Sequence, residues 1–127
     1  MIKNLTRKSV LVKNVETASS PWKKTRGLMF RRELASDSGL FMVFERERKH
    51  EIWMFGMRFP IDIIFINSDR MVVDIRHSVK PMGGNPKTWR IYKPSKPCKY
   101  VLEVNAGLAS KTGTEIGDTL SFNHLRV

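Results

Sequence analysis

The hexapeptide Ile61-Asp62-Ile63-Ile64-Phe65-Ile66 carries the strongest β-strand signal in the chain, because nearly all of its residues are bulky β-formers. Pro60 precedes it and marks the end of the extended segment before it. The polar tetrapeptide Asn67-Ser68-Asp69-Arg70 follows, and Met71-Val72-Val73-Asp74-Ile75 then resumes the apolar pattern. We therefore expect a central strand over 61–66 that forms a β-hairpin with the segment after it.

Similar patterns on both sides of this hairpin predict further strands and two short helices. The other predicted strands cover 5–15, 40–44, 52–55, 100–104 and 119–122. Ser20 and Pro21 are typical of a helix start, and Gly27 predicts the end of that helix. Asn105 is expected to cap a second helix over 106–111. Six or seven strands with two short helices indicate a mainly β (α+β) fold.

Length and composition limit the class of protein. The chain has 127 residues, of which 41% are apolar and 28% charged, so we expect a single domain over 1–127. Its single cysteine, Cys98, cannot form an internal disulfide, and three scattered histidines do not predict a metal site. We expect no cofactor. The longest apolar run, 40–44, is too short to span a membrane, and residues 1–8 lack the apolar core of a secretory signal. The sequence thus predicts a cytoplasmic protein without membrane partners.

Six ordered segments resemble a known family. They are Arg26-Gly27-Leu28-Met29-Phe30-Arg31, Gly39-Leu40-Phe41-Met42-Val43-Phe44, Trp53-Met54, Pro60-Ile61-Asp62-Ile63-Ile64-Phe65-Ile66, Val101-Leu102-Glu103-Val104-Asn105-Ala106-Gly107 and Gly117-Asp118. From about residue 19 to 122 the chain is similar to the uncharacterised family called domain of unknown function 192. The resemblance implies a single small β-barrel-like domain and no established activity. Many relatives have Lys-Asn-Thr after the Trp-Met pair, where this chain has Phe55-Gly56-Met57.

The net charge of +11 is concentrated at the two ends of the chain and in one long loop. Between 76 and 99 there are seven cations and no acid, with prolines and a Gly-Gly pair that exclude regular structure throughout. Such a loop is either a solvated basic face or a polyanion-binding surface. The residues expected to contact nucleic acid in the second case are Lys87, Arg90, Tyr92, Lys93, Lys96 and Lys99.

Two acids lie within predicted apolar strands and are candidate site residues. Asp62 lies between isoleucines, and Glu103 lies between Leu102 and Val104, so each carboxylate is either exposed or buried with a partner. Arg26 is the expected partner, because one guanidinium can bridge two carboxylates. The group then forms either a structural ion network or a ligand site.

The aromatic and sulfur-containing residues offer fewer candidates. Trp53 lies in an apolar segment and is expected in the core, whereas Trp89 lies in the basic loop and is expected to contact a ligand. The seven methionines are too widely spread to predict copper binding and fit core filling. A Cys98 nucleophile with His77 as its base has little support.

Three functions remain open from the sequence. The leading interpretation is a non-enzymatic binding module that holds an unknown polar small molecule or protein against Arg26, Asp62 and Glu103, with the basic loop as a lid. The second is nucleic-acid binding through loop 76–99. The third is an enzyme that uses Asp62 and Glu103 as an acid/base pair.

Overall fold

A five-stranded sheet in the order β3-β4-β9-β6-β7 forms the centre of the computed structural model, which describes residues 1–122 and 125. Its strands are β3 (Asn14–Ala18), β4 (Ser38–Arg48), β9 (Cys98–Asn105), β6 (Ile61–Ile66) and β7 (Val72–Val79). Strands β3 and β4 run parallel, and the other neighbours are antiparallel. Every residue of β6 is buried. The predicted central strand and its hairpin with β7 are therefore confirmed.

Two smaller sheets pair short segments that lie far apart in the sequence. They contain β10 (Leu120–Ser121), β1 (Ile2–Asn4) and β2 (Ser9–Val12) in one sheet, and β5 (Ile52–Trp53) with β8 (Ile91–Tyr92) in the other. The number of strands in residues 1–122 exceeds the six or seven expected, because β1 and β8 were not predicted and the one strand expected over 5–15 is divided between β2 and β3. The three sheets of this part of the chain do not close into a barrel, which corrects the barrel-like expectation. The mainly β character with two short helices is confirmed.

The first helix has the caps that its sequence predicts. Helix α1 (Pro21–Arg26) begins at Ser20, whose Oγ accepts a hydrogen bond from the Lys23 amide, and ends at Gly27 with φ +50°. Helix α2 (Leu108–Lys111) is shorter than expected and has Gly107 at its N-cap. Asn105 does not cap it, since its side-chain amide donates to the carbonyl oxygen of Leu34.

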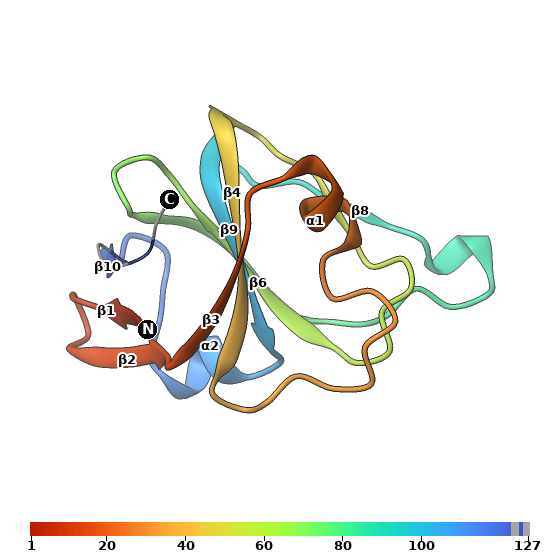
Figure 1. Ribbon diagram of the computed structural model, residues 1–127, viewed down its shortest axis with the longest axis horizontal. Helices are drawn as coiled ribbons and strands as arrows, with labels where there is room; N and C mark the ends of the chain where they lie inside the picture. The colour runs from red at the N-terminus through yellow and green to blue at the C-terminus, as the bar shows by residue number, and fades with distance from the viewer. Residues whose placement is uncertain (123–124, 126–127) are drawn as a thin grey trace.

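The two faces of the central sheet bury separate apolar clusters. We call them the α1 face and the α2 face after the helix on each side. Figure 1 shows α1 on one side of this sheet and β1 and β2 on the other. Side chains alternate along the strands, so Ile61, Ile63 and Phe65 pack on the α1 face while Ile64 and Ile66 pack on the α2 face. The small sheet of β1, β2 and β10 covers the α2 face, and α1 and β5 cover the α1 face.

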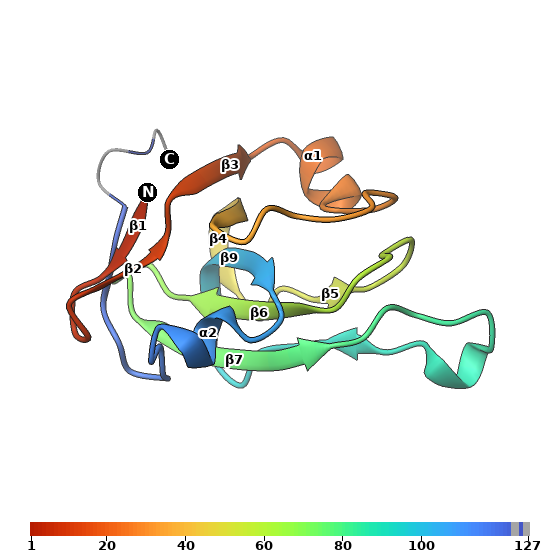
Figure 2. The same cartoon turned by 90° about the horizontal axis from the view of Figure 1, so that it is seen from below.

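The basic loop leaves the body of the protein after β7. It extends away from the sheets to a 3-10 helix, η1 (Pro86–Thr88), and returns to pair β8 with β5 (Figure 2). Within the described ranges, none of the helices has both the length and the apolar character needed to cross a membrane.

Candidate functional site

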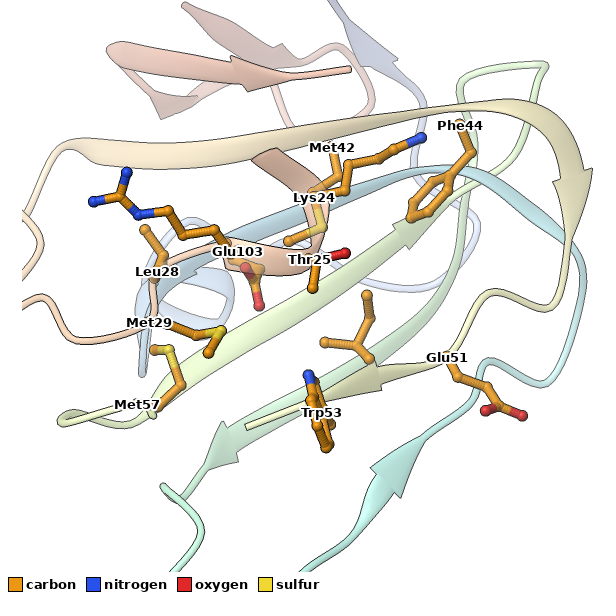
Figure 3. A pocket seen from close by; sticks show the side chains of 13 residues that line it. Lys24, Thr25, Leu28, Met29, Met42, Phe44, Glu51, Trp53, Met57 and Glu103 are labelled. Atoms are coloured by element: carbon orange, nitrogen blue, oxygen red, sulfur yellow. The ribbon is translucent and has the colours of Figure 1, made fainter. Parts of the chain in front are cut away.

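A cavity of about 360 Å³ opens on the α1 face between α1, β4, β5 and β9 (Figure 3). Its walls are mainly apolar, with thioether, aromatic and aliphatic groups from β4, β5 and the loops that follow α1 and β5. These side chains are Leu28, Met29, Met42, Phe44, Trp53 and Met57. Figure 3 shows the three methionine side chains and Trp53 around the same space as the Glu103 carboxyl group.

Glu103 is the buried ionisable group of this cavity. It lies opposite Leu40 in the β4–β9 ladder and opposite Ile63 in the β6–β9 ladder, which places its side chain on the α1 face. Only 3% of the residue is exposed, and no residue of the described chain hydrogen-bonds or ion-pairs with its carboxyl group. Burial disfavours the charged form and raises the pKa of Glu103 to about 7 from 4.5. At neutral pH this group exchanges between a proton donor and a charged acceptor.

Gly27 lets the end of α1 approach this carboxyl group closely. Its backbone has φ +50°, a conformation that favours glycine. A Cβ atom at this position would lie 3.3 Å from Met42 Cε and 3.4 Å from Glu103 Oε1. The glycine that ends the helix therefore also fixes the roof of the cavity above Glu103.

Two cations of α1 contribute to the cavity walls but leave Glu103 unpaired. Lys24 Nζ donates to the carbonyl oxygen of Val43 at 3.0 Å and lies 4.5 Å from the centre of the Phe44 ring. Arg26 is exposed and lines the same cavity as Glu103. The side chains of Arg26 and Glu103 line the same cavity but form no ion pair with each other.

Asp62 lies on the other side of the sheet. Because Ile63 is opposite Glu103 in the β6–β9 ladder, the side chain before it points to the α2 face. Asp62 Oδ1 accepts a hydrogen bond from Ser78 N at 2.8 Å, and Oδ2 accepts from Gly107 N and Ala109 N at 3.1 and 3.0 Å. The expected convergence of Asp62 with Arg26 and Glu103 is not observed, since Asp62 joins a strand to the start of α2.

The family comparison agrees with the resemblance seen in the sequence. The model of domain of unknown function 192, described as an uncharacterised ACR, matches residues 2–122. The chain belongs to this DUF192 family. Its curated relatives carry the name UPF0127 protein, and no function is established for the family.

Two curated relatives show how far the sequence similarity extends along the chain. A Pyrococcus furiosus UPF0127 protein is 33% identical over 124 residues, which cover 96% of this chain and 97% of the relative. One from Thermococcus gammatolerans is 34% identical over 127 residues, covering 97% of this chain and 75% of the relative.

Both solved structures are bacterial and share the fold of the chain. A Sinorhizobium meliloti protein described as a proposed transcription regulator has a TM-score of 0.79 and 34% identity, covering 87% of this chain and 82% of its own. A Novosphingobium aromaticivorans protein of unknown function has a TM-score of 0.78 and 30% identity, covering 85% of this chain and 74% of its own.

The basic loop of this DUF192 chain does not cover the Glu103 cavity. No residue between 76 and 99 lines that cavity in the described structure. Trp89 is 51% exposed and donates its indole N–H to the carbonyl oxygen of Gly83 at 2.8 Å, so it lies within the loop itself. Lys87, Arg90 and Tyr92 line a second cavity beside β7. The expected lid is thus a separate surface.

Several residues of the Glu103 cavity carry no signal of their own in the sequence. Trp53 was expected in the core but is 50% exposed, because its neighbour Ile52 takes the buried position in the alternating strand β5. Met57 belongs to the segment in which this chain departs from its relatives, and it places a thioether in the wall. Met29 is part of a recognised segment, although nothing in that segment predicts which way its side chain points.

Proposed function

We propose that this DUF192 chain binds a small amphipathic molecule in the cavity beneath α1. A hydrogen-bond donor of the ligand, such as an ammonium or hydroxyl group, contacts Glu103. The apolar part of the ligand packs against the methionine and aromatic walls.

The state of Glu103 is the observation that supports this proposal most strongly. A buried polar group without a partner costs free energy, so most such groups in proteins have one. Glu103 has none among residues 1–122 and 125, yet its carboxyl group borders an open cavity. A ligand with a donor group supplies the missing partner and recovers part of that cost.

The size and walls of the cavity agree with a small organic ligand. A volume of about 360 Å³ lies in the usual range for small-molecule sites. Thioether side chains adapt to different shapes, and Trp53 and Phe44 offer flat apolar surfaces. Arg26 adds a cation at the rim that suits an acceptor on the same ligand.

A two-carboxylate enzyme has less support. Such a mechanism requires Asp62 and Glu103 at one reacting centre, and the central sheet separates them. Three backbone amides already occupy the Asp62 carboxylate. Among the residues that line the cavity, Glu103 is then the one buried acid, which suits recognition of a donor group.

Benzylamine is a suitable first probe because it joins an ammonium group to an apolar ring. In a Trp22→Phe, Trp89→Phe background, Trp53 reports on the cavity by fluorescence. We expect a saturable change on titration and about tenfold weaker binding in Glu103→Gln, equal to about 1.4 kcal/mol.

Glu51→Gln is the matched control, since Glu51 is an exposed carboxylate that lines the same cavity. It should bind benzylamine nearly as well as the parent protein. An unsaturable response, or equal weakening in both variants, would contradict the assignment to Glu103.

A further inference from the structure

A second cavity, of about 640 Å³, lies between β7 and the basic loop and is rich in cations. The basic residues that line it are Arg76, His77, Lys80, Lys87 and Arg90. No acid is among the residues that line it in the described structure. We infer that this basic cleft binds the phosphate groups of a single-stranded nucleic acid.

A β-bulge sets the strand side of the basic cleft. Ile61 pairs with Val79 and Ile63 with Arg76, so His77 and Ser78 together face the single residue Asp62. Ser78 has φ +49°, and its amide donates to Asp62 Oδ1. Bulges redirect neighbouring side chains and often lie beside functional sites. Here the bulge holds the stretch that presents Arg76 and His77 to the cleft.

Hydrogen bonds from β7 fix the return of the loop. Arg76 Nη2 donates to the carbonyl oxygen of Lys93 at 2.8 Å and lies 3.2 Å from Asp74 Oδ2. The same Asp74 oxygen accepts from the amide of Ser95 at 2.9 Å. Among the described residues, Arg76 Nε has no hydrogen-bond partner although it is a buried donor. These contacts give the cleft a defined shape before any ligand arrives.

Three cations of the cleft have no ion-pair partner in the part of the chain that the structure describes. Within residues 1–122 and 125, the side chains of Lys80, Lys87 and Arg90 form no ion pair, and each of these residues is exposed. The carboxylate of Asp74, the acid nearest in sequence to Arg76, already forms an ion pair with Arg76 and accepts a hydrogen bond from the Ser95 amide. Three unpaired cations around one hollow attract groups of several negative charges.

The surroundings of the cleft favour a polymer over a small phosphate compound. The exposed residues Lys93 and Lys96 continue the positive charge along the returning chain. Trp89 is 51% exposed and Ile91 62%, which offers apolar surface on the same loop. Proteins that bind single strands combine a basic groove with aromatic side chains on which bases stack. The loop also projects from the body, where a long strand can reach it (Figure 2).

Fluorescence anisotropy with a labelled oligothymidylate tests the inference. We expect binding at about 20 mM salt that weakens steeply as salt rises. The Lys80→Ala, Lys87→Ala, Arg90→Ala triple variant should bind at least about tenfold more weakly, and its salt slope should be smaller by about 2.

A triple variant of Lys3, Lys13 and Lys111 to Ala removes the same charge from exposed residues outside the cleft. It should retain most of the affinity. Equal losses in both triple variants, or no binding at low salt, would overturn the inference. Full displacement of the oligonucleotide by an equal phosphate concentration of inorganic tripolyphosphate would overturn it in favour of a small phosphate ligand.

Discussion

Asp62 and Glu103 lie on adjacent strands, yet their carboxyl groups point to opposite faces of the central sheet. Glu103 stands opposite Ile63, and Asp62 stands opposite Val104. Three backbone amides bind the Asp62 carboxylate on the α2 face, whereas the Glu103 carboxyl group borders a cavity without a partner in residues 1–122. The first acid therefore stabilises the fold, and the second is available to a ligand.

The raised pKa of Glu103 makes the stability of the protein depend on pH. Its pKa is about 7 in the folded chain against 4.5 unfolded, because burial disfavours the charged form. The folded chain then holds the proton more tightly. The contribution of Glu103 is greatest below about pH 4.5, falls as pH rises, and is lost above about pH 7, with a total of about 3 kcal/mol.

Denaturant unfolding of the parent and Glu103→Gln isolates this contribution. The variant has no titrating group at this position, so its stability relative to the parent should rise by about 3 kcal/mol between about pH 4.5 and pH 8. A constant difference across that range would show that the pKa of Glu103 is unshifted.

Removal of the Asp62 carboxylate should destabilise the fold strongly. Asp62→Ala leaves three amides without their acceptor, and we expect a loss of about 3 kcal/mol in the free energy of unfolding. Asp69→Ala, at an exposed turn, should change it by less than about 0.5 kcal/mol. If Asp62→Ala fails to fold, Asp62→Asn, which keeps one acceptor oxygen, gives an intermediate value. A loss as small as that of Asp69→Ala would show that the three hydrogen bonds contribute little.

Gly27→Ala should disturb the cavity as well as the backbone. The new methyl group meets Met42 and Glu103 at 3.3 and 3.4 Å in a backbone with φ +50°. We expect a loss of about 1 kcal/mol in thermal or denaturant unfolding and weaker benzylamine binding. Gly84→Ala is the control, because nothing lies within 4 Å of its added methyl group. Similar values for the two variants would be evidence against a close contact above Glu103.

The thiol of Cys98 should be inert in the folded protein. The residue is fully buried, and burial raises the pKa of its thiol to about 11. Reaction with a coloured thiol reagent at about pH 8 should proceed only at the rate at which the protein opens, and it should accelerate on adding denaturant. Rapid labelling of native protein would contradict this and return Cys98 to the list of reactive candidates.

Local sequence patterns predicted the elements that depend on neighbouring residues. The run 61–66 and the turn after it predict β6 and β7. Ser20 and Gly27 predict the two ends of α1. The pairing of β5 with β8 joins segments almost forty residues apart through only two residues each. No local pattern carries that information.

The candidate site shows a similar division. The sequence left Glu103 either exposed or buried with a partner, and the structure buries it without a partner in residues 1–122 and 125. The basic loop does present a cluster of cations. The face to which Asp62 points depends on the register between β6 and β9, which composition does not reveal. Met29, Met42 and Met57 meet at the cavity only because α1 and β5 fold over the same face.

The pKa of Glu103, measured by carbon NMR of its side-chain carboxyl group with and without benzylamine, tests the central claim most directly. The account predicts a pKa near 7 in the free protein. Benzylamine should lower it by about one unit, because the bound ammonium group stabilises the charged carboxylate. A free pKa near the ordinary value of 4.5, or a raised pKa that saturating benzylamine leaves unchanged, would contradict a ligand site at Glu103.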